Sequence, residues 1–223
     1  EAYLACLMGY ATHGLLDSCT SYGTQLLWPF SDARVAWDIM SIVDPLFTIP
    51  LLVFVITAAR TQRQWLSWLA CGWMLSFFAL GWVQHDRAMQ AATQVASIRG
   101  HEPLRLSVKP SFANLLVWKA IYEHEDSYYV DAVRVGAQMT WFPGARVPKL
   151  DLAAHFPGVK PDSQQALDIE RFRWFSDDYL APMENSPRIV DMRYSMVPNE
   201  VEPMWGIDVD PAKQTAHVRW WSS

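Results

Sequence analysis

The sequence predicts an α-helical membrane part over residues 1–85, a linker over 86–104 and a soluble α+β domain over 105–223. The charged side chains are unevenly distributed, because residues 1–100 hold 11 of them and no Lys, whereas residues 101–223 hold 30. The first part contains long stretches almost without charge, which are typical of membrane helices. In the second part apolar and polar residues alternate, which is typical of half-buried strands.

The overall composition excludes several classes of protein. With 223 residues and 51% apolar side chains, the chain can bury a sizeable core and is not disordered. A formal net charge of −5 argues against nucleic-acid binding. Three Cys residues do not make a disulfide scaffold, and we expect them to be packed rather than catalytic.

Two apolar segments joined by a short link predict a helical hairpin. Gln64–Gln84 has 21 residues and no charge, and such a helix spans about 30 Å, the thickness of the hydrocarbon core. Ile39–Ala59 carries a single charge, Asp44, and two prolines. The alternative for Gln64–Gln84 is the core helix of a soluble protein, although such helices seldom run so long without a charge.

The link between these segments also predicts an orientation. Arg60 and Arg63 favour a cytoplasmic link, which places the carboxy-terminal domain in the periplasm of a bacterium, whereas Arg34, Arg87 and Arg99 favour the opposite arrangement. A third apolar stretch opens the chain. It has no basic region typical of a signal peptide, and we expect the sequence to lack an upstream part.

The second part shows strands and one helix. Alternation or β-rich composition predicts strands, and a capping box at Asp162 predicts a helix that ends near Phe175. The turn 123–126, although rich in His and acidic residues, is expected to be solvated. The predicted strands are Leu115–Tyr122, Tyr128–Val135, Arg188–Val197 and Thr215–Trp221.

Ionisable residues within the apolar part are the candidates for chemistry. His13 and Asp17 are four residues apart, so on a helix they share one face, as two metal ligands or a ligand and its orienting partner would. The alternative is a histidine at a helix end that is hydrogen-bonded to a nearby Asp. Asp44 also needs a partner, and it could be a third ligand, a group that orients a ligand, or a helix cap. Asp38 is expected to be solvated.

These residues lie in a recognisable pattern. The stretch Gly9–Phe30 (GYATHGLLDSCTSYGTQLLWPF), followed by Ser41–Phe47 (SIVDPLF), resembles the YdjM-like family of bacterial membrane-bound metal-dependent hydrolases. The matching elements are G-Y-x-x-H-x-x-x-D, T-x-x-G-x-x-L-L-W-P and an Asp-Pro that enters the next membrane helix. The hairpin and the segment Asn114–Trp118 resemble the longer members of the family.

The resemblance implies an inner-membrane protein with a divalent metal, for which zinc is one candidate. His13 and Asp17 match the H-x-x-x-D ligands, and Asp44 matches the Asp-Pro, as a catalytic base or a further ligand. Family members carry upstream P-D-x-D and H-R-x-x-T-H-S elements. This sequence begins after both, so we expect an incomplete metal site here.

The expected function is hydrolysis of an ester or phosphoester by metal-activated water at the membrane face. The expected partners are the lipid bilayer and a lipid or envelope-derived substrate, the latter inferred from location alone. The alternative is a membrane-anchored binding or sensor protein without enzymatic activity. A polar pocket around His13, Asp17 and Asp44 would favour the enzyme, and a groove lined by Trp141, Trp174 or Trp205 would favour the binding protein.

Overall fold

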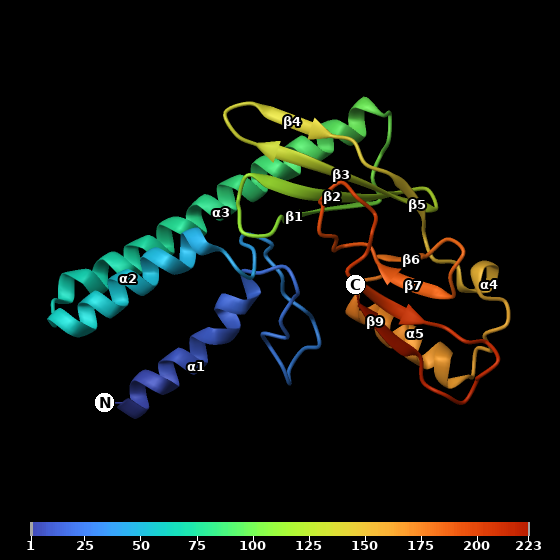
Figure 1. Ribbon diagram of the computed structural model, residues 1–223, viewed down its shortest axis with the longest axis horizontal. Coiled ribbons are helices and arrows are strands. Elements are labelled where there is room, and N and C mark those ends of the chain that lie inside the picture. The colour runs from blue at the N-terminus through green and yellow to red at the C-terminus, as the bar shows by residue number, and fades with distance from the viewer. Residues whose placement is uncertain (1, 223) are drawn as a thin grey trace. The chain divides into compact units, whose positions relative to one another are not determined.

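The computed structural model describes residues 2–222, whose helices and strands are labelled in Figure 1. Close contacts divide the chain into two compact units. The division passes through one long helix and four strands, which therefore contribute residues to both units. Unit 1 comprises Glu1–Gln94, Val108–Lys119 and Val133–Thr140, and unit 2 comprises Val95–Ser107, Ala120–Ala132 and Trp141–Ser223.

The first helix, α1 (Ala2–Ser18), is apolar and exposed except at its carboxyl end, where Ser18 is buried. A polar turn follows it. The Thr20 hydroxyl donates to the Asp17 carbonyl at 2.7 Å, and Gly23 has a φ of 80°, which a residue with a side chain seldom adopts. A sharp polar turn therefore forms around Gly23.

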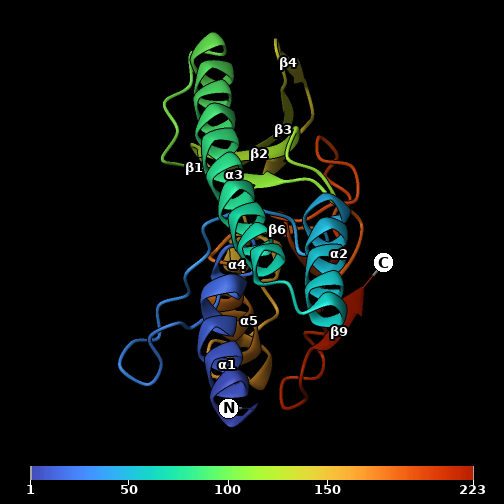
Figure 2. The ribbon, with the colours of Figure 1, turned by 90° about the vertical axis from the view of Figure 1, so that its left-hand side faces the viewer.

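The next two helices, α2 (Pro45–Thr61) and α3 (Gln64–Ile98), form the predicted hairpin and lie side by side in Figures 1 and 2. The second helix begins at Pro45 and not at Ile39, because a residue that precedes proline is disfavoured in a helix. Among the described residues, α3 is the one helix whose length and composition suffice for a membrane span. Only 22% of its most apolar window is buried, unlike the core helix of a soluble protein.

The third helix is longer than the uncharged stretch predicts, so the expected linker 86–104 begins inside it. Its last turns change from an apolar to an amphipathic pattern. Residues spaced by three and four positions are at most 3% exposed there, which gives the helix a buried stripe. The buried residues are Ala88, Ala91, Ala92, Val95 and Ala96.

The first sheet has the order β1-β2-β3-β4, and β5 also pairs with β3. The predicted strands 115–122 and 128–135 are confirmed to within two residues as β2 and β3, and the turn between them includes Glu125 at a φ of 52°. The strands are β1 (Arg105–Pro110), β2 (Val117–His124), β3 (Ser127–Val135), β4 (Met139–Phe142) and β5 (Arg146–Pro148).

The second sheet is antiparallel with the order β6-β7-β8-β9. Ile169 and Phe172 of α5 belong to the same buried cluster as Ile189 and Ile207 of this sheet. The elements of this part are α4 (Leu152–His155), α5 (Gln164–Phe175), β6 (Leu180–Pro182), β7 (Arg188–Asp191), β8 (Trp205–Asp208) and β9 (Arg219–Ser222).

Three predictions in this part were wrong in detail. The strand predicted over 188–197 ends at Asp191, because its carboxylate accepts the Arg193 N–H at 3.1 Å and turns the chain. The strand predicted over 215–221 begins only at Arg219. The cap of α5 is Ser163 and not Asp162, since the Ser163 hydroxyl accepts the Ala166 N–H.

Candidate functional site

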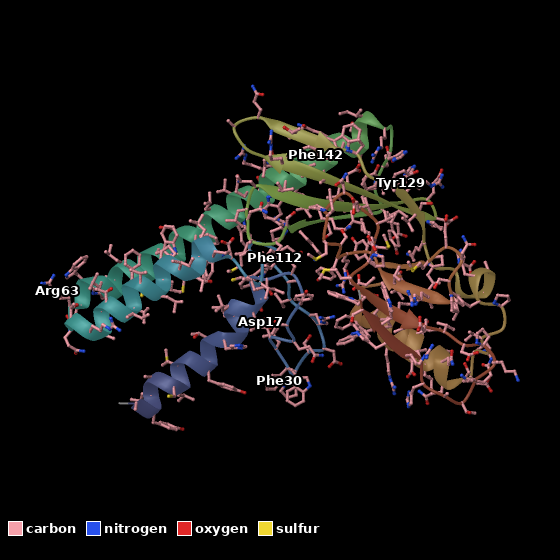
Figure 3. The ribbon with its side chains drawn as sticks, viewed as in Figure 1. Asp17, Phe30, Arg63, Phe112, Tyr129 and Phe142 are labelled. Carbon is pink, nitrogen blue, oxygen red and sulfur yellow. The ribbon has the colours of Figure 1, made fainter. Side chains whose placement is uncertain are left out.

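His13 and Asp17 lie one turn apart on α1, and both are exposed. The Asp17 carboxylate accepts a hydrogen bond from the Thr24 hydroxyl. Thr24 is itself held in place by two backbone hydrogen bonds to Val35. The Thr24 N–H donates to the Val35 carbonyl at 2.9 Å, and the Val35 N–H donates to the Thr24 carbonyl at 2.8 Å. Asp17 lies near the carboxyl end of α1 in Figure 3. Its carboxylate is therefore oriented by the loop after α1, as an orienting partner positions a metal ligand.

Asp44 is the N-cap of α2, which was one of the three roles considered for it. Its Oδ1 accepts the N–H groups of Leu46 at 2.9 Å and Phe47 at 3.3 Å. The residue is 2% exposed, and its other oxygen, Oδ2, is buried without a hydrogen-bond partner among residues 2–222. Leaving a buried acceptor unsatisfied costs about 1–3 kcal/mol, and more for a charged group.

The loop between α1 and α2 buries further polar groups against β1 and the segment that follows it. Asp38 was expected to be solvated, but it is an ion-pair partner of Lys109 at 2.8 Å, with side chains only 13% and 8% exposed. The Ser41 hydroxyl accepts the Ala113 N–H at 3.1 Å. Ser111 Oγ is buried and has no hydrogen-bond partner in the described part of the chain. Sequence analysis did not identify Ser41, Lys109 or Ser111.

The predicted ligands do not make a complete metal site. No group of three His, Cys, Asp or Glu side chains in the described range could hold a metal ion. A catalytic zinc site uses three protein ligands. His13 and Asp17 supply two on one helix face, and Asp44 is not grouped with them. The described residues therefore do not fit a full zinc site.

Unit 2 contains a charged cluster that the sequence analysis missed. Glu123 was assigned to a solvated turn, but it is 7% exposed and pairs with Arg105 and Lys149, each at 2.7 Å. Lys149 also bonds Asp178 at 2.9 Å. Burial of Asp178 disfavours its ionised form, but hydrogen bonds from Lys149 and Arg173 outweigh that effect and lower its pKa.

A second pair of titratable groups in unit 2 lies beside a cavity. His217 Nδ1 is 2.8 Å from Asp168 Oδ2, and the effect of burial on Asp168 is outweighed by hydrogen bonds from His217, Gln164 and the Val218 N–H, so the pKa of Asp168 is lowered. His217 lines a cavity of about 590 Å³ together with Arg188 and Arg219. The sequence analysis placed His217 only within the predicted strand Thr215–Trp221 and gave no sign of this pairing.

Two of the three tryptophans proposed to line a groove have other roles. Trp141 Nε1 donates to Asp131 at 3.0 Å, and Trp205 Nε1 donates to Asp191 at 3.3 Å. Trp174 does line a cavity, of about 630 Å³, with Leu167 and other residues of α5.

The amino-terminal helices and the loop between them carry the pattern noted in the sequence, and comparison with known families agrees with it. Residues 1–88 match the model of the YdjM inner membrane protein family. The amino-terminal part of this chain is similar to that family. The YdjM match includes His13, Asp17 and Asp44, and it ends within α3, before the first sheet. No curated protein and no solved structure matches the chain.

The YdjM match confirms the resemblance drawn from the motifs. It gives the family's location, the inner membrane, and it covers the whole α2–α3 link. The apolar helix α3 agrees with that location.

Proposed function

We propose that this chain is a membrane-bound, metal-dependent hydrolase in which His13 and Asp17 are two of the metal ligands. The observation that carries the proposal is the YdjM match over residues 1–88, which contains both. The exposure of both side chains and the hydrogen bond that orients Asp17 support it. A divalent metal would supply a polarised water for hydrolysis. The described residues provide only part of its ligand set.

Asp44 is the proposed catalytic acid–base residue. Its Oδ1 is occupied by the cap of α2, whereas Oδ2 has no partner among the described residues. Buried groups that are left unsatisfied in this way often have a functional role. The proposal assigns to Oδ2 the acceptance of a proton from the attacking water.

The α2–α3 hairpin is proposed to insert in the inner membrane, with the carboxy-terminal domain in the periplasm. The apolar exposed faces of both helices and the family's location support insertion, and Arg60 and Arg63 at the link favour a cytoplasmic link. A site beside the bilayer suits an ester or phosphoester from a lipid or another envelope component.

The metal content of the detergent-purified chain tests the ligand assignment. Mass spectrometry should find weak, substoichiometric metal binding in the unmodified chain, because the described residues supply only part of the ligand set, and a further loss in His13→Ala and in Asp17→Ala. His155→Ala removes an exposed histidine of α4 and should retain the metal. Equal metal in all four proteins would overturn the assignment, and so would its absence from the unmodified chain.

Hydrolysis of para-nitrophenyl esters and phosphoesters tests the activity separately. Asp44→Asn should abolish turnover without removing the metal, because it changes the proposed proton acceptor and not a ligand. Turnover at the unmodified rate in Asp44→Asn would remove Asp44 from the chemistry.

A second candidate is a membrane-anchored binding protein. The cavity beside Trp174 favours it, because Leu167 and Trp174 are each 53% exposed there and could contact a partner. A chain that binds no metal and hydrolyses none of these esters would support this second function.

A further inference from the structure

The α2–α3 hairpin contains a groove near its link that neither the family match nor the proposed hydrolysis assigns. Its volume is about 550 Å³, and it is lined by both helices and the link itself. Leu51, Val55 and Met74 line its apolar part. Arg63, with the polar residues next to it, lines its other end. The groove therefore changes from apolar to cationic along its length.

Side-chain size accounts for the open space near the link. Nearer the start of α2 they are packed by aromatic rings, since the Phe47 and Phe77 centroids are 5.1 Å apart and Trp73 Nε1 donates to the Phe47 carbonyl at 3.2 Å. Near the link the facing residues are small, as at Ala59 and Ala70. Short side chains leave the space between two helix backbones unfilled, which makes the groove.

The length of the groove fits one leaflet of a bilayer. On α2 its lining runs from Leu51 to Ala59, which is about 12 Å of helix at about 1.5 Å per residue, and it continues to Gln62 in the link. On α3 it runs from Gln64 to Met74, about 15 Å by the same rise. Half of a hydrocarbon core about 30 Å thick is about 15 Å. An acyl chain lying along the groove would therefore have its polar end at the link.

The cationic end lacks a partner among residues 2–222. The Arg63 guanidinium makes no hydrogen bond or ion pair with any described residue. Figure 3 shows Arg63 at the linked end of the hairpin. A guanidinium pairs with phosphate through two parallel hydrogen bonds, and at the headgroup level of a membrane the available anion is a lipid phosphate.

We infer that this groove is a binding site for one anionic phospholipid, with an acyl chain between α2 and α3 and the phosphate on Arg63. The inference rests on the proposed membrane insertion of the hairpin, and it is independent of metal binding and hydrolysis. The bound lipid would fill space that the side chains of Ala59 and Ala70 leave open.

Native mass spectrometry of the detergent-solubilised chain tests this site with two probes, phosphatidylglycerol and phosphatidylcholine with identical acyl chains. The first phosphatidylglycerol should bind about fivefold more tightly than the first phosphatidylcholine, because both lipids carry the phosphate but only phosphatidylglycerol keeps a net negative charge for Arg63 to attract. Arg63→Gln should remove this preference. Arg60→Gln is the matched control, because it removes the same charge three residues earlier and does not line the groove.

A second pair of variants tests the acyl chain. Ala59→Leu adds bulk to an exposed residue of the groove and should weaken the binding of both lipids. Ala79→Leu adds the same bulk to an exposed residue of α3 outside the groove and should leave binding unchanged. Circular dichroism should show the same helix content in all four variants.

Several outcomes would overturn the inference. They are equal binding of the two lipids to the unmodified chain, equal effects of Arg63→Gln and Arg60→Gln, and unchanged binding to Ala59→Leu. Failure of the chain to float with phosphatidylglycerol vesicles would also overturn it, by removing membrane insertion. The metal and hydrolysis assays report on the proposed activity separately, so the two failures are distinguishable.

Discussion

Arg99, which directly follows α3, forms a bidentate ion pair with Asp131. Arg99 Nη1 lies 2.6 Å from Asp131 Oδ2, and Nη2 lies 2.8 Å from Oδ1. Asp131 also accepts hydrogen bonds from Trp141 Nε1 and the Gly144 N–H, each at 3.0 Å. Hydrogen bonding to Asp131 raises the pKa of Arg99. One buried carboxylate therefore connects the residue that follows α3 with β3, β4 and the loop after β4.

Replacing Arg99 should destabilise the chain strongly. Arg99→Leu leaves the Asp131 carboxylate, whose side chain is 1% exposed, without its cation, and breaking a buried pair in this way costs about 3–5 kcal/mol. Urea unfolding measures the change. Arg134→Leu, at an exposed position of β3, is the control and should change stability by less than about 0.5 kcal/mol. Equal effects of the two substitutions would show that the pair contributes little.

Substitutions at Asp44 should separate capping from chemistry. Asn caps a helix about as well as Asp, so Asp44→Asn should keep the stability of the chain within about 0.5 kcal/mol. Asp44→Ala should lose about 1 kcal/mol, because the acceptor for the Leu46 and Phe47 N–H groups is removed. Thermal unfolding in detergent measures both. If Asp44→Asn loses as much stability as Asp44→Ala, the carboxylate charge stabilises the fold beyond its role as a cap.

Two glycines of α3 should respond oppositely to alanine. A Cβ at Gly81 would lie 2.2 Å from the Ile39 carbonyl oxygen, so Gly81→Ala must displace backbone and should cost about 1–3 kcal/mol. Nothing lies within 4 Å of a Cβ at Gly72, and Gly72→Ala should be neutral or stabilising by up to about 1 kcal/mol. Thermal unfolding in the same detergent compares them. A neutral Gly81→Ala would contradict the close approach of the 38–41 loop.

The contribution of the Lys149–Asp178 pair should depend on pH. The pKa of Asp178 is lowered in the folded state, so its stabilising effect is complete above the unfolded pKa of about 3.9 and is lost as the pH falls through the folded value. Lys149→Met should therefore be less stable than the unmodified chain at pH 6, and the difference should shrink below about pH 4. Urea unfolding across this range measures it. Lys160→Met, which removes an exposed Lys without an ion pair among the described residues, should show no such convergence.

The sequence predicted the elements whose signal is local. The uncharged run Gln64–Gln84 and the link after Thr61 predicted the hairpin, since charge and length along one segment decide the outcome. The same holds for β2 and β3, where the turn and the flanking β-rich residues lie together in the sequence. The end of α3 was missed because its last turns are amphipathic rather than apolar. The uncharged run ends at Gln84, so its length could not show that the helix continues to Ile98.

Groups whose partners are distant in the sequence could not be predicted. Asp38 is paired with Lys109, 71 residues away, and Glu123 with Lys149, 26 residues away, so both were taken for solvated residues. Within the candidate site, only the residues that belong to the sequence motif were predicted. The H-x-x-x-D spacing placed His13 and Asp17 on one helix face, but nothing in it indicated that Thr24 orients Asp17.

Because Asp44 caps α2, a mutational screen at this position would detect folding defects as well as loss of catalysis. In a saturation screen for loss of function, nearly every replacement of Asp44 would score as deleterious, because most side chains cannot accept the two N–H groups that begin the helix. Such a screen could not tell a folding defect from a chemical one. Asn keeps the cap and nearly the same side-chain shape while it removes the charge, so the fitness of the Asn allele would indicate whether selection at this position acts on catalysis.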